Sequence, residues 1–191
     1  MTSPPPDHRA RKRAETHRRI YRAAMDLFRE HGYDAVTVGQ IVAASQVSVP
    51  TFYDHFPSKE HVVLPMPDPG AIEKILLAQG EGLTIAERMR SGILHWLSAF
   101  QGTDRDELLE RWRIVVSTPG LRTRAATFER ATAEMILGFV TPETRADVVP
   151  DIVVTASLSA YTQILVRWAE ADGRRPLEEV AEEVLAALHE L

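Results

Sequence analysis

Four side chains suited to hydrogen bonding with nucleic acid lie close together in the chain: Ser48, Thr51, Tyr53 and His55. In a short helix that starts after Ser48, Phe52 and Phe56 lie about one turn apart and face the core, so the hydrogen-bonding groups remain on the opposite side. Hydroxyl, phenol and imidazole groups bind phosphate oxygens and base edges. We therefore expect this face to contact DNA, and the alternative is an ordinary solvated surface.

The stretch from residue 37 to residue 56 has the pattern of two short helices joined by a tight turn. Thr37 and Gln40, three residues apart, form a capping box that begins the first helix. Ser48 caps the second helix, and Pro50 falls in its first turn, where a missing N–H has no consequence. A second helix of this size fits the major groove of DNA. The stretch therefore predicts a helix-turn-helix.

The net charge of −5 is distributed unevenly along the chain. Residues 1–60 carry nine basic and seven acidic side chains, which leaves thirteen basic and twenty acidic side chains for the rest. A basic end on an acidic body is typical of a protein that docks on phosphate by one end only, although a solvated helix start explains each basic residue equally well. The expected DNA contacts are Arg11, Arg13, Arg18, Thr37, Val38, Ser48, Pro50, Thr51, Tyr53, His55 and Lys59.

Residues 28–60, FREHGYDAVTVGQIVAASQVSVPTFYDHFPSKE, resemble the DNA-binding segment of TetR-family transcriptional regulators. The shared features are the Gly-Tyr after the first helix, the Thr-Val that opens the second, and the Thr-Phe-Tyr-x-His-Phe run with the Lys-Glu that follows it. Two positions depart from the family: Ser45-Gln46 replaces its usual Ala-Gly, and Pro50 is uncommon there. The resemblance implies an all-α fold, with an N-terminal three-helix helix-turn-helix DNA-binding domain and a C-terminal helical domain for ligand binding and dimerisation.

The segment LPMPDPG, residues 64–70, separates the two expected domains. Three prolines in seven residues end the fourth helix early and indicate a boundary. Ser58 is expected to cap that short helix. We predict a disordered tail over residues 1–10, a helix-turn-helix domain over 11–64, and an all-helical effector-binding and dimerisation domain over 71–191.

Helix-start signals recur in the second domain. Thr84 with Glu87 forms a capping box, and Thr118 and Thr141 each precede a proline, which indicates a helix start. Pro150 is expected to divide a short helix from a longer one. Apolar positions on these helices suit a small hydrophobic effector, although Met and Trp at helical spacing usually belong to a core. The candidate ligand-binding residues are Met89, Ile93, Trp96, Trp112, Val116, Phe128, Met135, Tyr161 and Leu165.

The last two helices predict how the chain assembles. Residues 152–166 carry no charge on any face, and a helix that is apolar all round is expected to be buried all round. One covering layer would be a second copy of the chain, which predicts a four-helix dimer interface; the alternative is a monomer with one central helix. The candidate interface residues are Leu158, Thr162, Leu177, Val180, Val184 and Leu188.

Composition argues against several other classes of protein. The chain has no cysteine, and its seven histidines form no spacing typical of a metal site. No glycine-rich phosphate loop or nucleophile motif is present, so we predict neither an enzyme nor a cofactor. No signal peptide or membrane span is expected, which predicts a cytoplasmic protein.

The predicted function is a ligand-responsive repressor that binds a palindromic operator in double-stranded DNA as a homodimer. The alternative is a DNA-tethered protein-interaction module or an activator without a small-molecule effector.

Overall fold

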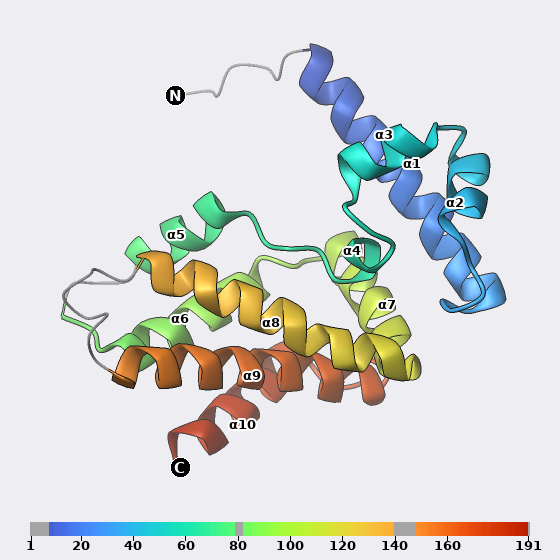
Figure 1. Ribbon diagram of the computed structural model, residues 1–191. Coiled ribbons are helices and arrows are strands. Elements are labelled where there is room, and N and C mark those ends of the chain that lie inside the picture. Colours follow the sequence, from blue (N-terminus) through green and yellow to red (C-terminus); the bar gives the residue numbers. More distant parts are fainter. Residues whose placement is uncertain (1–7, 79–81, 140–147, 191) are drawn as a thin grey trace. The chain divides into compact units, whose positions relative to one another are not determined.

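The chain folds into two compact helical units, Met1–Pro65 and Met66–Leu191 (Figure 1). The computed structural model describes residues 8–78, 82–139 and 148–190. Within these ranges the secondary structure is α-helical and contains no strand. The predicted all-α fold with a helix-turn-helix unit and a helical second unit is confirmed.

The first unit contains α1 (His8–His31), α2 (Val38–Ser45), α3 (Val49–His55) and α4 (Glu60–Val63). One face of α1 is buried, with Ile20, Ala24 and Phe28 in the core. Gly32 ends the helix with φ of +80°, a left-handed conformation that glycine adopts without strain. The helix begins at His8, three residues before the predicted start at residue 11, within the segment expected to be a tail.

Local capping sets the bounds of α2 as the sequence predicts. Gln40 N donates to the Thr37 hydroxyl at 3.3 Å, and Thr37 N donates to Gln40 Oε1 at 2.8 Å. α4 has only four residues, and Leu64 lies at its C-terminal end, directly before the proline-rich segment. The expected cap from Ser58 is wrong: its hydroxyl donates to Glu60 Oε2 at 2.6 Å, and Lys59 occupies the cap position without a side-chain cap bond.

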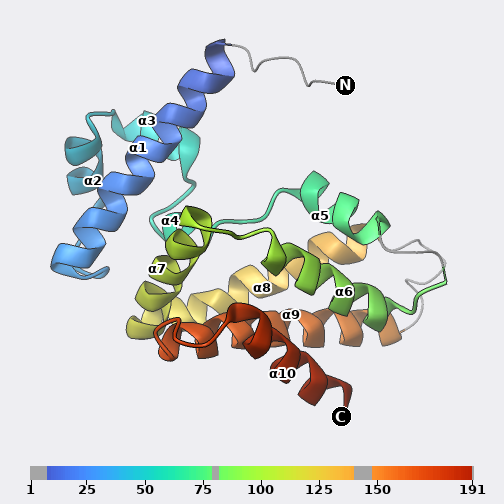
Figure 2. The same cartoon turned by 180° about the vertical axis from the view of Figure 1, so that it is seen from behind.

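The second unit contains α5 (Pro69–Leu77), α6 (Ile85–Ser98), α7 (Thr103–Ser117), α8 (Pro119–Phe139), α9 (Val148–Glu170) and α10 (Leu177–His189). α6 begins with the predicted capping box of Thr84 and Glu87. α9 packs against α6, α7, α8 and α10, so it is the central helix of this unit. Figures 1 and 2 show α8 and α9 running side by side.

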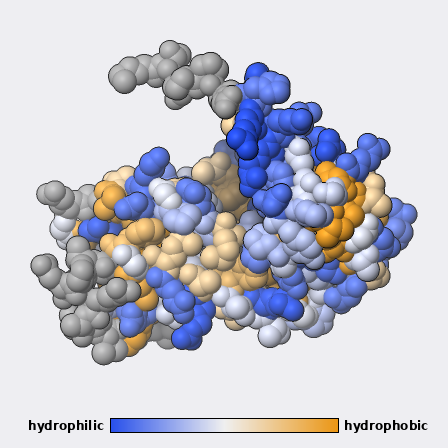
Figure 3. Space-filling model, turned by 45° about the horizontal axis from the view of Figure 1, so that its top comes forward, coloured by the Kyte–Doolittle hydropathy of each residue, from blue (hydrophilic) through white to orange (hydrophobic). Residues whose placement is uncertain are grey.

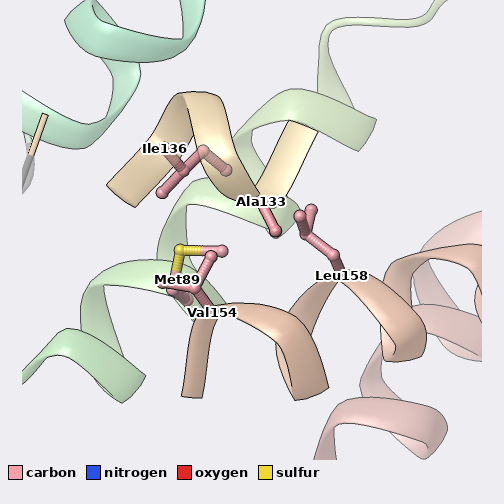
Figure 4. Packing of buried hydrophobic residues seen from close by; sticks show 5 residues of the cluster. All are labelled: Met89, Ala133, Ile136, Val154 and Leu158. Carbon is pink, nitrogen blue, oxygen red and sulfur yellow. The ribbon is translucent and has the colours of Figure 1, made fainter. Parts of the chain in front are cut away.

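The core between α6, α8 and α9 consists of small and medium apolar side chains. Figure 4 shows Met89 from α6 beside Val154 from α9, with Ile136, Ala133 and Leu158 completing the cluster. All five side chains are buried. Val149–Glu170 is long and apolar enough to span a bilayer by length and composition, but the core helix of a soluble protein meets the same criterion.

One expectation about α9 is wrong. Pro150 lies in its first turn, where proline is compatible with a helix, and does not divide two helices. Within the single chain, Ile152 is 62% exposed and Thr155 and Gln163 are exposed, so the chain's own elements cover only part of this helix. α9 therefore carries an uncharged face that no element in the described part of the unit covers. The expected helix start at Thr141 lies outside the described residues.

The candidate ligand and dimer residues divide between core and half-buried positions. Among the ligand candidates, Met89, Ile93, Trp112 and Leu165 are buried, whereas Trp96, Val116, Phe128, Met135 and Tyr161 are half-buried. Among the dimer candidates, Leu158, Leu177 and Val180 are buried in the chain's own core, and Thr162, Val184 and Leu188 are half-buried. Leu158, Leu177 and Val180 could contact a second copy only if the core opened. These three side chains therefore do not belong to an exposed face of the chain.

Candidate nucleic-acid interface

The helix-turn-helix of α2 and α3 is positioned from within by Phe52. This side chain is fully buried, and its ring lies 5.8 Å from the ring of Phe56, which is also buried. The Ser48 hydroxyl accepts from Thr51 N at 3.2 Å and caps α3. The two phenylalanines therefore face inward as predicted, and Tyr53 on the opposite side is exposed, whereas Thr51 and His55 are half-buried.

The outer face of α3 combines aromatic, aliphatic and hydroxyl groups. Tyr53 is 50% exposed and Val49 is 45% exposed. The hydroxyls of Ser48 and Thr51 lie 2.7 Å apart, so one of them donates to the other. Pro50 is exposed in the first turn. Helical periodicity places Val49 on the same side as Phe52, but its side chain is 45% exposed, so the Val49 methyl groups are available for contact with a thymine methyl.

The turn between α2 and α3 is built without glycine. Gln46 takes its place with φ of 54° and ψ of 45°, the left-handed conformation that glycine adopts in most such turns. Gln46 N donates to Ala43 O at 3.3 Å, and Val47 N donates to Val42 O at 3.1 Å. The buried Ser45 hydroxyl donates to Ile41 O at 2.7 Å. Backbone bonds on both sides of Gln46 thus hold the turn in spite of its unfavourable conformation.

Positive charge is supplied by the start of α1. Figure 3 shows strongly hydrophilic residues where this helix leaves the grey N-terminal segment. Arg11 and Arg18 are exposed. Arg13 Nη2 donates to Asp54 O near the C-terminal end of α3 at 2.9 Å. Arg13 therefore fastens α1 to α3 in addition to any contact with phosphate.

His17 belongs to this site, although the sequence did not single it out. Its ring stacks on Phe56 at 4.3 Å between centroids and lies 5.7 Å from the ring of His55. His17 lies three residues before Ile20 and therefore on the same face of α1. This spacing is the feature of the sequence that could have indicated its packing. Burial lowers the pKa of His17, and the nearby His55 and Arg13 lower it further. Burial and Arg13 likewise lower the pKa of His55, while Asp54 acts in the opposite direction.

These lowered pKa values predict a stability that depends on pH. The unfolded chain has the ordinary imidazole pKa of about 6.5 and binds protons at a higher pH than the folded chain. Stability contributed by the neutral rings is therefore complete above pH 6.5 and is lost as the pH falls below it. We expect the urea midpoint to fall between pH 7.5 and pH 5.5, and His17→Gln to reduce this dependence. His8→Gln, at the exposed start of α1, is the matched control; an unchanged pH profile in His17→Gln contradicts the assignment.

Lys59, an expected phosphate contact, also forms bonds within the protein. Its ammonium group donates to Tyr33 O at 2.9 Å and to Val36 O at 2.7 Å, and it lies 4.1 Å from the centroid of the Tyr33 ring. Burial lowers its pKa, although Asp34 and Glu60 act in the opposite direction. Lys59 thus ties α4 to the segment between α1 and α2, and its charge is already engaged by the protein's own carbonyl groups.

Thr37 and Val38 lie at the start of α2. Thr37 is exposed, but both its backbone N–H and its hydroxyl are hydrogen-bonded to Gln40 Oε1. Val38 is half-buried. The structure therefore brings together the face of α3, the start of α1 and the N-terminus of α2 within one unit, and the N-terminus of a helix favours an anion.

Comparison with known proteins identifies the family. Residues 20–66 match the model of the bacterial regulatory proteins of the tetR family, and residues 83–191 match that of the MftR C-terminal domain. TcmR, an HTH-type transcriptional regulator of Streptomyces glaucescens, is 35% identical over 140 residues, which are 68% of this chain and 59% of TcmR. The transcriptional regulator MftR of Mycobacterium tuberculosis is 27% identical over 168 residues, or 83% of this chain and 82% of MftR.

Solved structures agree on the fold. NalD of Pseudomonas aeruginosa superposes with a TM-score of 0.59 at 20% identity over 94% of this chain and 96% of NalD. FadR of Thermus thermophilus gives 0.53 at 26% identity over 90% of this chain and 92% of FadR. The second-unit match alone spans more than half of the chain, and the first-unit match covers the helix-turn-helix. The chain therefore belongs to the tetR family of bacterial transcriptional regulators.

Proposed function

We propose that this regulator is a ligand-responsive repressor that binds a palindromic operator as a homodimer. The observation that carries the proposal is the outer face of α3, where Tyr53 is 50% exposed beside the hydroxyls of Ser48 and Thr51. A short helix with such a face enters the major groove with its N-terminal residues toward the bases. The exposed Arg11 and Arg18 bind phosphate on the flanks.

Homodimerisation is supported by the uncovered face of α9. Ile152 and Thr155 are exposed, and α9 carries no charged side chain from Ile152 to Val166. Val184 and Leu188 on α10 are half-buried and add apolar surface. We propose that these outward positions of α9 and α10 pair with the same helices of a second copy, because an isologous interface of two helices from each chain closes with twofold symmetry.

A response to a small ligand is supported by the relatives. FadR of Thermus thermophilus is described as a transcriptional repressor in complex with lauroyl-CoA, and FadR of Bacillus subtilis as a complex with stearoyl-CoA. NalD is described as the secondary repressor of a multidrug efflux pump. We place the effector of this chain in the second unit, among the half-buried aromatic side chains Trp96, Phe128 and Tyr161.

Selection of bound DNA from a random pool tests the operator and the dimer together. We expect two inverted half-sites whose centres lie about one helical turn, or a multiple of it, apart. We also expect affinity for the selected site to fall steeply with salt, because phosphate contacts release counterions. Recovery of a single half-site without a partner would contradict the twofold arrangement.

The ligand response is tested separately by melting the protein against a library of small molecules. An effector raises the melting temperature as its concentration rises, because it binds only the folded chain. An effector of a repressor also lowers affinity for the selected operator. A chain that binds its operator but responds to no small molecule matches the alternative of a DNA-tethered protein-interaction module.

A further inference from the structure

The helices α6, α7 and α9 each carry one hydrogen-bonding side chain of a partly buried polar group: Trp96, Arg111 and Tyr161. Trp96 Nε1 on α6 donates to the Tyr161 hydroxyl on α9 at 3.3 Å. Burial raises the pKa of Tyr161, while the Trp96 hydrogen bond and the charge of Arg111 on α7 act in the opposite direction. The helices that carry Arg111 and Tyr161, α7 and α9, pack against each other. All three side chains are half-buried within the second unit.

The hydrogen-bonding capacity of this group is incomplete. Arg111 Nε is buried and has no hydrogen-bond partner within the described ranges, and no ion pair to Arg111 is formed there. The Tyr161 oxygen accepts from Trp96, so its own proton is free to donate, and it meets no acceptor among the described residues. A guanidinium N–H and a phenol O–H are thus both present in one neighbourhood without a carboxylate or carbonyl to receive them.

Four other arginines of the same unit behave differently. Each of the four pairs with a carboxylate, in the pairs Arg90–Glu182, Arg105–Glu178, Arg113–Asp172 and Arg122–Glu170. Arg113 is the closest comparison because it lies two residues from Arg111 on α7, is exposed, and donates from Nε to Asp172 Oδ1 at 2.7 Å. Arg113 therefore has an acidic partner, whereas the more buried Arg111 has none among the described residues.

A partly buried charge without a partner destabilises a folded protein, so its presence indicates a function. We propose that the effector carries a carboxylate, which accepts from Arg111 Nε–H and from the Tyr161 hydroxyl. The planar guanidinium fork matches a carboxylate in geometry and charge. The apolar body of the acid lies against Trp96 and Phe100, whose rings form an edge contact at 5.8 Å between centroids. This inference rests on the proposed ligand response and specifies its chemistry.

The first test needs no ligand. Arg111→Met keeps the apolar stem and removes the unpaired charge, so we expect the full-length ligand-free protein to melt about 2–6 °C higher than wild type. Arg113→Met removes a paired, exposed charge on the same helix, and we expect it to leave the melting temperature unchanged or lower it. A lower melting temperature for Arg111→Met overturns the proposal, because it means that the guanidinium is satisfied in the folded chain.

The second test compares an acid with a neutral molecule of the same shape. Sodium decanoate is expected to raise the melting temperature of wild type and of Arg113→Met, whereas decan-1-ol gives a much smaller shift. Arg111→Met is expected to lose the response to decanoate, Arg111→Lys to retain part of it, and Tyr161→Phe to weaken decanoate binding about tenfold. Equal shifts by decanoate and decan-1-ol, or no shift by decanoate in wild type, overturn the proposal.

Operator affinity measured on the same variants separates this proposal from the proposed function. Decanoate binding that depends on Arg111 but leaves operator affinity unchanged supports the carboxylate site and contradicts the ligand-responsive repressor. If wild type and Arg111→Met both bind the operator but respond equally to the acid and the alcohol, the DNA-binding proposal is supported. The carboxylate site is then overturned.

Discussion

Replacement of Phe52 by alanine is expected to lower the free energy of unfolding of the first unit by about 3–5 kcal/mol. Phe52 is fully buried, and the rings of Phe56 and Tyr53 lie 5.8 Å and 5.4 Å from its own. Alanine leaves a cavity directly beneath the outer face of α3, so DNA binding is expected to be lost together with stability. Few single changes in so small a unit have a larger expected effect.

The position of the tryptophans allows this change to be assigned to one unit. All three, Trp96, Trp112 and Trp168, lie in the second unit. Urea unfolding followed by far-ultraviolet circular dichroism is therefore expected to show the loss, while the transition in tryptophan fluorescence remains where it was. Phe52→Leu is the matched control, with an expected loss of less than about 1.5 kcal/mol. A loss below about 1 kcal/mol in Phe52→Ala would mean that the ring does not support α3.

The second large effect is expected on operator affinity. Tyr53→Ala removes a side chain that is 50% exposed on the outer face of α3, so the fold is expected to change little in stability. A direct contact with a base or a phosphate contributes about 1–3 kcal/mol, which corresponds to an affinity about 5–150 times weaker. Fluorescence anisotropy with the selected operator at fixed salt measures this change.

Two variants separate the causes of the effect. Tyr53→Phe keeps the ring and removes the hydroxyl, so the difference between the two variants measures the hydrogen bond alone. Arg29→Gln, an exposed change near the C-terminal end of α1, serves as a control for a surface substitution outside the proposed contact face. If Tyr53→Ala binds the operator as tightly as wild type does, the outer face of α3 does not contact DNA as we propose.

Features determined by neighbouring residues could be predicted from the sequence. The caps at Thr37, Ser48 and Thr84 form as expected, because each is a hydrogen bond within three residues of its origin. The early end of α4 was predicted for the same reason, since prolines act on the adjacent backbone. The family was also recognisable, because its matched residues lie within residues 28–60.

Features determined by distant contacts were missed. The sequence did not predict that Lys59 donates to carbonyls 26 and 23 residues earlier in the chain. His17 was overlooked because only the packing of α1 on α3 brings it onto Phe56. Arg111 is one of many arginines in the sequence. Only the structure shows that its Nε has no acceptor among the described residues, whereas Nε of the nearby Arg113 has one. Periodicity indicates which face of a helix is apolar, but it does not indicate which polar groups find partners.

The proline-rich joint of residues 64–70 has a consequence for how such regulators diversify. α4 ends at Val63 and α5 begins at Pro69, so no helix runs from one unit into the other, and each unit closes its own core. The first family model likewise ends within this region, at residue 66, and the second begins beyond it, at residue 83. Recombination at this joint would replace one unit of the protein by another. The remaining unit would keep all of its helices whole and its core closed. Chimeras spliced between Pro65 and Pro69 should therefore fold, and new pairings of operator and signal can arise in a single genetic step.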